Sequence, residues 1–398
     1  MRWPKGFLWG TGASSTQCEG AAPASDWWAW ERAGRAPTSG DGNGFSTRFA
    51  DDFRLLAELG LRQHRLSIEW ARIEPEPGRR DARAIAHYRA VLTRAVEAGV
   101  EPWICLHHFT LPRWFADDGG FLLERNRTEA WMRHVEFMAE TFGDLARGWK
   151  PVNETNFYPF SGYRGLGMPP GHDDRAEWAL ATEAIHLATA EAAVRLKQTG
   201  APVASIFSLS TAVAQDDEPA TRRTIERIYA THWATWLDLF REGLLRVPGR
   251  APVARPDLAG AFDLIGFSFY STLGVRAGRV AAHPPGAPLS PLGYGIWADG
   301  LGLVLDRLHA ELPGTPLLVA EYGVGTDDDA VRAAYLERGL EVTRAALARG
   351  IDVRGFFHWT AVDNYEWLLG YDVAFGLFDR DRNMRPSARI REREARSP

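Results

Sequence analysis

Two glutamates, Glu154 and Glu321, are the residues of this 398-residue chain with the clearest capacity for chemistry. Each directly follows a short apolar run that is typical of a buried strand. Two carboxyl groups that face each other across a cavity can cleave a glycosidic bond, one giving a proton to the leaving oxygen and the other staying ionised. The alternative is that either glutamate only opens the next helix, where an acid is favoured.

Aromatic side chains accompany these carboxyl groups. The chain contains 16 tryptophans, and two of them, Trp359 and Trp367, flank Asp363 and Glu366. An indole ring can cover the C–H face of a sugar while neighbouring acids bind its hydroxyls. These two tryptophans are therefore predicted to contact sugar, whereas most of the others are predicted to lie in the core.

His107 and His108 follow another strand-like run. Neighbouring residues on a strand point to opposite faces, so only one of the pair can face a site. No second histidine or carboxylate accompanies them at ligand spacing, so the sequence predicts no metal site and no cofactor. One histidine is expected to donate a hydrogen bond to a ligand hydroxyl, and a buried core histidine is the alternative.

The elements that position these residues are strands alternating with amphipathic helices. Strands are predicted at residues 7–13, 62–68, 101–107, 148–153, 202–207, 263–269, 317–321 and 354–359. Helical patterns at 49–59, 84–98 and 129–141 are typical of the segments between them. Eight strand–helix units predict parallel strands closed into a single (β/α)₈ barrel over residues 1–398. An open doubly wound sheet is the alternative.

A barrel collects the carboxyl ends of its strands at one mouth, where active sites lie. Glu154 follows the fourth strand and Glu321 ends the seventh, so they are expected on opposite sides of that mouth. The mouth also collects the tryptophans and histidines described above.

Composition restricts the partners. With 46 basic and 51 acidic side chains the net charge is −5, which gives no reason to expect nucleic acid or an anionic membrane. No apolar run is long enough for a membrane span or a signal peptide. Two cysteines, Cys18 and Cys105, do not make a disulfide framework, so a reducing compartment, the cytoplasm, is expected. The expected partner is a small-molecule glycoside, and the sequence makes no prediction of oligomeric state.

Seven segments resemble the motifs of glycoside hydrolase family 1, the β-glucosidase family of retaining (β/α)₈ enzymes, over nearly the whole chain. They are FLWGTGASSTQCEG, HRLSIEWARIEP, LHHFTLP, VNE, FSFYS, VAEYG and FHWTAVDNYEWLLGY. Together these segments are highly specific, and they imply a retaining β-glycosidase.

The resemblance implies catalytic roles for five residues. Glu321 takes the place of the nucleophile, and Glu154 takes the place of the acid/base. Arg65 takes the place of the arginine that pairs with the nucleophile, and Tyr270 that of the tyrosine that touches it. Asn153 is then expected to hold the sugar 2-hydroxyl.

The same resemblance implies a sugar-binding set. Gln17 and His108 match residues that bind sugar hydroxyls. Trp359 matches the platform under the sugar, and Glu366 and Trp367 match the ligands of its outer hydroxyls. A carboxylate at Glu366 is expected to disfavour a 6-phosphate.

Four positions depart from the family pattern. Phe109 stands where the family has a tryptophan, which removes an indole N–H donor near the sugar 3-hydroxyl. Ser268, Thr155 and Tyr322 replace an asparagine, a proline and an asparagine. Because a lost donor costs about 1–3 kcal/mol, we expect the preferred sugar to be deoxygenated or modified rather than plain glucose.

Two other functions remain open from the sequence. One is a transglycosylase that passes the sugar to a natural-product acceptor instead of water. The other is a catalytically silent barrel that binds sugar without turnover.

Overall fold

The computed structural model describes residues 2–396, and its central sheet has eight parallel strands in the order β4-β3-β2-β1-β13-β12-β9-β5. These strands are β1 (Leu8–Gly12), β2 (Gln63–Ser67), β3 (Glu101–His107), β4 (Gly148–Val152), β5 (Phe207–Ser208), β9 (Ile265–Phe269), β12 (Leu317–Tyr322) and β13 (Val353–Trp359). Parallel bridges from Val203 to Trp149 and from Ala204 to Leu264 join the two edges of the sheet. The fold is therefore the predicted (β/α)₈ barrel.

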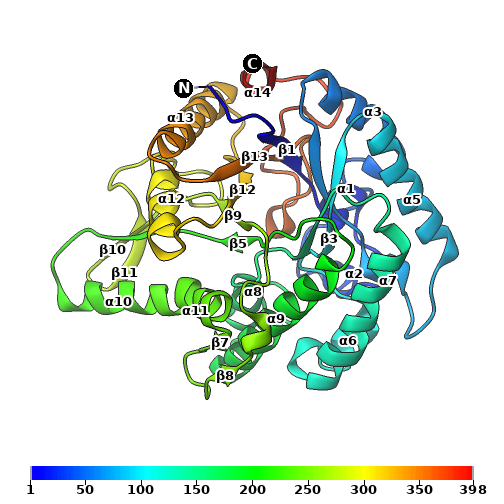
Figure 1. The fold of residues 1–398 in the computed structure, drawn as a ribbon, viewed down its shortest axis with the longest axis horizontal. Coiled ribbons are helices and arrows are strands. Elements are labelled where there is room, and N and C mark those ends of the chain that lie inside the picture. The colour runs from blue at the N-terminus through cyan, green and yellow to red at the C-terminus, as the bar shows by residue number, and fades with distance from the viewer. Residues whose placement is uncertain (1, 397–398) are drawn as a thin grey trace.

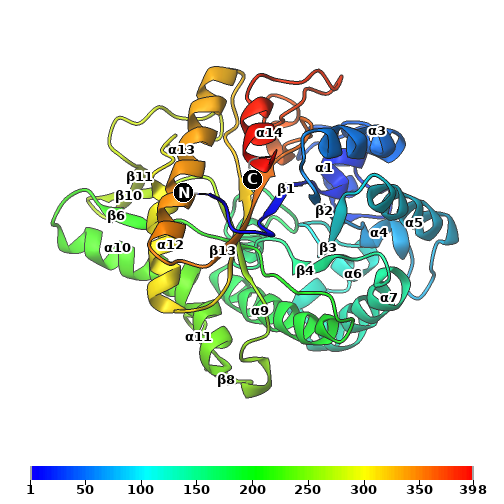
Figure 2. The same ribbon diagram turned by 45° about the horizontal axis from the view of Figure 1, so that its top comes forward.

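Helices form a ring around the barrel (Figure 1, Figure 2). The helices between successive barrel strands, and the one after β13, are α3 (Phe45–Glu58), α5 (Ala82–Glu97), α7 (Met132–Phe142), α9 (Arg175–Lys197), α11 (Thr235–Glu242), α12 (Gly300–Glu311), α13 (Asp329–Ala348) and α14 (Ala388–Arg396). The segment before β1 and helix α14 lie near each other in Figure 1. The Trp3 indole donates to Glu394 of α14 over 3.0 Å, which ties the two ends together.

Further short helices lie in the connections. They are α1 (Ser15–Glu19), α2 (Asp26–Arg32), α4 (Trp70–Ile73), α6 (Arg113–Asp117), α8 (Tyr158–Tyr163) and α10 (Pro219–Tyr229), with turns η1 (Gly120–Leu122), η2 (Asn126–Trp131), η3 (Ala230–Ala234), η4 (Pro256–Leu258) and η5 (Trp367–Leu369). Of these elements, α1, α8, α10, η3 and η5 contribute residues to the cavity described below.

Local sequence signals explain where the long helices begin and end. Asp81 caps α5 by accepting the backbone N–H groups of Arg83 and Ala84. Gly99 and Gly350 follow α5 and α13 with φ of 71° and 88°, a conformation that glycine adopts without strain. Both glycines therefore allow the chain to leave the helix and enter the next strand.

The interior of the barrel below the mouth is packed with apolar side chains. Trp103, Leu318 and Phe357 are buried there. Trp103 is one of the tryptophans that the sequence predicts to lie in the core. Lys150 lies among them, with its ammonium nitrogen 4.5 Å from the Phe357 ring centre and 5.5 Å from the Trp103 ring centre. Among the described residues no side chain or backbone group accepts a hydrogen bond from Lys150.

A small extension beside the barrel was not predicted from the sequence. It is a three-stranded sheet, β11-β10-β6, of β6 (Ala212–Ala214), β10 (Leu273–Arg276) and β11 (Arg279–Ala282), and α10 packs on it. Both views place α10 and this sheet on one side of the barrel (Figure 1, Figure 2). A two-stranded sheet of β7 (Leu244–Leu245) and β8 (Val253–Ala254) lies below α11. Strands this short carry too little alternation to be recognised.

Among residues 2–396, no helix has the length and apolar character needed to cross a membrane.

Candidate active site

A cavity of about 620 Å³ opens at the carboxyl ends of the barrel strands, within the usual range for small-molecule sites. Ten of the eleven residues predicted for the site line it: Gln17, His108, Phe109, Asn153, Glu154, Tyr270, Glu321, Trp359, Glu366 and Trp367. The eleventh, Arg65, is fully buried directly behind Glu321. The structure thus brings the whole predicted set together from segments far apart in the sequence.

Arg65 on β2 connects three of the lining residues. Its guanidinium forms an ion pair with Glu321 on β12 and donates to Asn153 Oδ1 over 3.2 Å. A Cβ atom at Gly12 of β1 would lie 2.7 Å from Arg65 Nη2, so only glycine leaves room for this arrangement. The guanidinium also lies 5.0 Å from the centre of the Trp359 ring.

The carboxylate of Glu321 is hydrogen-bonded on both oxygens. Arg65 donates to Oε1, and the hydroxyl of Tyr270 donates to Oε2 over 2.5 Å. These two donors fix the position of the Glu321 carboxyl group in the wall of the cavity.

Glu154 lies in a different environment. Burial, and then the charge of Glu321, raise the pKa of Glu154 to about 8, against a smaller opposing effect of the Ser268 hydroxyl that donates to it. A carboxyl group with this pKa holds its proton at neutral pH. Two carboxyl groups in one cavity with separated protonation states can divide the roles of acid and nucleophile.

Glu366 is the third carboxyl group of the cavity. The amide of Gln17 donates to Glu366 Oε2 over 3.2 Å and to the Tyr365 carbonyl over 2.8 Å. Burial, and then the charges of Glu321 and Glu154, raise the pKa of Glu366 to about 8. A raised pKa weakens the repulsion that a carboxylate at this position would exert on a 6-phosphate, and the exclusion of phospho-sugars stays a prediction. In its protonated form Glu366 can donate to a sugar hydroxyl.

His108 faces the cavity and His107 does not. Arg65 Nη1 donates to His108 Nδ1 over 2.9 Å, which leaves the ring proton on Nε2. Burial, and then the charge of Arg65, lower the pKa of His108 well below its usual value, so the ring is neutral. His107 packs instead against Tyr158, with ring centres 4.7 Å apart.

No group of three or more His, Cys, Asp or Glu side chains within residues 2–396 is arranged to hold a metal ion. Both cysteines, Cys18 and Cys105, are buried free thiols.

Aromatic rings form one wall of the inner cavity. The ring of His108 is stacked with Trp359 at 5.8 Å and with Trp367 at 6.1 Å, and Phe109 meets Trp367 edge-on at 5.6 Å. Phe109, Glu154 and Trp367 have φ of 70°, 47° and 37°. Non-glycine residues held in this region are strained by about 1–3 kcal/mol each and cluster at functional sites.

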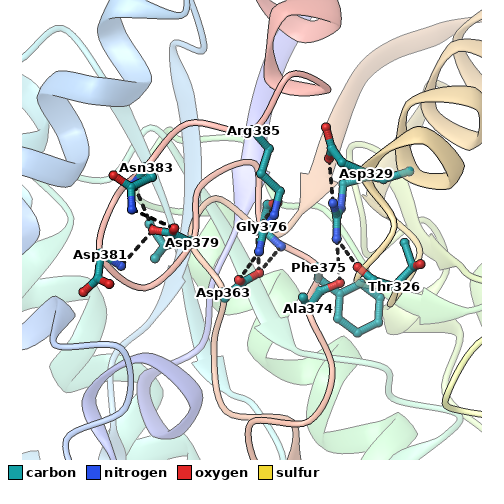
Figure 3. Close-up of polar contacts among 12 residues, drawn as sticks. Thr326, Asp329, Asp363, Ala374, Phe375, Gly376, Asp379, Asp381, Asn383 and Arg385 are labelled. Atoms are coloured by element: carbon teal, nitrogen blue, oxygen red, sulfur yellow. Dashed lines mark hydrogen bonds and ion pairs between the residues drawn. The ribbon is translucent and has the colours of Figure 1, made fainter.

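A polar network holds the segment after β13 that carries Glu366 and Trp367 (Figure 3). Asp363 forms an ion pair with Arg385 at 2.6 Å and accepts the Gly376 N–H over 2.7 Å. Asp363 is absent from the cavity lining that the described residues form, so its place beside the tryptophans is structural rather than sugar-binding.

The four departures from the family pattern separate into two pairs. Phe109 and Ser268 line the cavity. The Thr155 hydroxyl lies 3.3 Å from the Thr189 hydroxyl, and the Tyr322 hydroxyl donates to a backbone carbonyl over 2.8 Å. Only the first pair can touch substrate directly.

The outer half of the cavity was missed from the sequence. It includes Phe157, Phe160, Ile228, Leu273 and Tyr294, from α8, α10, β10 and the loop that follows β11. Partly buried apolar residues in short elements carry the same signal as ordinary core residues, so no pattern distinguishes them.

Comparisons with known proteins identify the family of this chain. The model of glycosyl hydrolase family 1 matches residues 1–247 and 257–397. A coniferin β-glucosidase from Pinus contorta is 27% identical, over 95% of this chain and 88% of its own. A bifunctional β-D-glucosidase/β-D-fucosidase from Bifidobacterium breve is 29% identical, over 95% and 93%. The solved structure of a β-glycosidase from Pyrococcus horikoshii superimposes with a TM-score of 0.90 at 28% identity, over 100% and 95%. The chain therefore belongs to glycosyl hydrolase family 1 and is a glycoside hydrolase.

Proposed function

We propose that the protein is a retaining β-glycosidase that cleaves a β-O-glycosidic bond through a covalent glycosyl-enzyme intermediate. The observation that carries the proposal is the contrast between the two carboxyl groups. Arg65 and Tyr270 both donate to the carboxyl group of Glu321, whereas burial and the charge of Glu321 raise the pKa of Glu154 to about 8. A retaining mechanism needs one carboxyl group that holds a proton and one that is ionised, about 5–5.5 Å apart, and we assign these roles to Glu154 and Glu321.

In the first step Glu321 attacks the anomeric carbon while Glu154 gives its proton to the leaving oxygen. The glycosyl ester that forms removes the negative charge of Glu321. Because that charge helps to raise the pKa of Glu154, its loss lets Glu154 act as a base. Glu154 then takes a proton from water, which attacks the ester and releases the sugar with retained configuration.

The surrounding residues support both steps. Arg65 and Tyr270 keep Glu321 ionised and oriented, and Asn153 is placed to hold the 2-hydroxyl. The sugar-binding set that we propose comprises Gln17, His108, Phe109, Trp359, Glu366 and Trp367. His108 presents its Nε2–H as a donor, and Trp359 provides the apolar platform.

The preferred sugar is proposed to lack or to modify the 3-hydroxyl. Phe109 lines the cavity without a polar atom on its side chain, so a hydroxyl beside it gains no partner. An enzyme that preferred aryl β-glucosides to 3-deoxy or 3-modified analogues by a large margin in kcat/KM would contradict this.

A second candidate is transglycosylation onto an apolar acceptor by the same covalent intermediate. The apolar outer half of the cavity favours it, because a bound acceptor there would exclude water. Product analysis separates the two: hydrolysis releases free sugar, and transfer gives a new glycoside.

We also propose that residues 1–398 act as one catalytic unit, since strands from both ends of the chain lie side by side in the barrel. Two buried free thiols favour a reducing compartment, the cytoplasm.

The proposal is tested with a panel of aryl β-glycosides assayed against wild type, Glu154→Gln and Glu321→Gln. Wild type is expected to release the aryl alcohol, and Glu321→Gln is expected to lose this activity. Glu154→Gln should keep kcat/KM near that of wild type only with activated leaving groups, which need no proton, and its kcat should fall because the second step lacks its base. A wild type that cleaves no aryl glycoside, or unchanged turnover in Glu321→Gln, would refute the proposal.

A further inference from the structure

The outer half of the cavity differs in chemistry from the half that holds the carboxyl groups. We define the apolar half by its six main lining residues: Phe157, Phe160, Leu209, Ile228, Leu273 and Leu292. We infer that this half binds a bulky apolar aglycone rather than a second sugar. The inference rests on the proposed function and specifies the leaving group of the same substrate.

A second sugar would find few partners in the apolar half. The inner half presents carboxyl and amide groups, such as those of Glu366, Gln17 and Asn153. The only Asp, Glu, Asn or Gln side chains among the described residues of the cavity lining are Gln17, Asn153, Glu154, Glu321 and Glu366, which all belong to the predicted sugar-binding and catalytic set. Sugar hydroxyls buried there would lose water without gaining the planar acceptors that bind them in the inner half.

Three hydroxyl groups among the cavity-lining residues already donate to the backbone. Ser210 donates to the Ser271 carbonyl over 2.8 Å, Thr224 to the Gly278 carbonyl over 3.0 Å, and Thr231 to the Arg227 carbonyl over 2.9 Å. These side chains therefore have their only proton engaged. They cannot donate it to a ligand hydroxyl without breaking an existing hydrogen bond.

A dedicated piece of structure forms the wall of the apolar half. Ile228 lies on α10 and Leu273 on β10, two elements that pack together beside the barrel (Figure 1). At the rim Val280 of β11 is 56% exposed and Tyr294 is 38% exposed. Large apolar side chains left exposed in a concave surface mark a ligand site.

Arg227 is the one permanently charged residue among the described residues of this half. Its guanidinium donates to the Thr224 hydroxyl over 2.7 Å and lies on the solvent side of α10. Neither the Arg227 guanidinium nor the Thr224 hydroxyl changes the apolar surface that the six defining side chains present to the cavity.

The test uses alkyl β-glycosides from methyl to octyl, carrying the sugar that the aryl panel identifies, together with a disaccharide of that sugar. If the apolar half holds the aglycone, kcat/KM rises by about fourfold for each added methylene until the half is filled. The disaccharide is expected to be a poorer substrate than the hexyl glycoside. A flat series, or a disaccharide cleaved better than the hexyl glycoside, would overturn the inference.

A matched pair of variants locates the effect. Ile228→Asp places a charge in the apolar half, and it should reduce the ratio of octyl to methyl kcat/KM toward one. Leu303→Asp makes the same kind of change on α12, where Leu303 is 36% exposed and outside the cavity lining. In Leu303→Asp the dependence of kcat/KM on alkyl length should stay as in wild type. An unchanged dependence in Ile228→Asp would contradict the assignment.

Failure of the inference is distinguishable from failure of the proposed function. If the wild type cleaves no glycoside, the proposed function is refuted. If it cleaves aryl glycosides normally but kcat/KM does not depend on alkyl length, the proposed function stands and only the inference of an apolar aglycone is refuted.

Discussion

Replacing Ser268 by alanine tests how the environment sets the proton of Glu154. The Ser268 hydroxyl donates to Glu154 Oε1 and so stabilises the ionised form. A hydrogen bond to a charged group contributes about 1.5–3 kcal/mol, and one pKa unit corresponds to about 1.4 kcal/mol. Ser268→Ala is therefore expected to raise the pKa of Glu154 by a further one to two units or so.

The assay is the pH dependence of kcat/KM on an aryl β-glycoside, which reports the free enzyme. In wild type the activity should fall as pH rises through about 8, where Glu154 loses its proton. In Ser268→Ala this basic limb should move to higher pH by one to two units or so. Ser268→Thr keeps a hydroxyl and should restore the wild-type limb.

Ser161→Ala is the matched control, because Ser161 is also buried but its hydroxyl donates to the Tyr158 carbonyl over 2.8 Å. Its profile should match wild type. A basic limb that stays in place in Ser268→Ala, or moves to lower pH, would refute the reasoning about Glu154.

Three further predictions concern stability. Lys150→Met removes a buried amine that no described group accepts, so the free energy of unfolding from denaturant titration should rise by about 1–3 kcal/mol; a loss would contradict this. Glu366 has a folded pKa of about 8 against 4.5 unfolded, so the folded state binds more protons between these values and stability falls as pH rises through that window. Glu366→Gln should therefore gain Tm relative to wild type between pH 5 and 8, and a pH-independent difference would count against it. Asp363→Ala breaks the pair with Arg385 and should lower the free energy of unfolding by about 3 kcal/mol in a urea titration, with wild-type stability as the contrary result.

The fold could be predicted because each barrel strand is a short apolar run followed by an amphipathic helix. Only the fifth strand is weak: residues 203–204 pair through isolated bridges before the regular pairing of β5 begins at Phe207. The sheet formed by β6, β10 and β11 lies outside this alternation of strands and helices. Half-exposed strands of three or four residues are too short to show a clear alternation of apolar and polar residues.

The inner half of the site could be predicted because carboxyl, amide and indole side chains at strand ends are conspicuous. What the sequence could not supply is the effect of one side chain on another. The raised pKa of Glu366 results from burial beside two other carboxyl groups, and the structural role of Asp363 results from Arg385, 22 residues further along the chain. The sequence gives no chemical sign of the apolar half, since Ile228 and Leu273 cannot be told apart from ordinary core residues by their type.

The most direct measurement of the central claim is mass spectrometry of the trapped intermediate. The protein is incubated with an activated 2-deoxy-2-fluoro-β-glycoside, which slows release of the sugar more than its transfer to the enzyme. We predict a mass increase of one fluoroglycosyl group on the peptide that contains Glu321, and no label in Glu321→Gln. Labelling of Glu154, or no label on an enzyme that turns over aryl glycosides, would contradict the proposed mechanism.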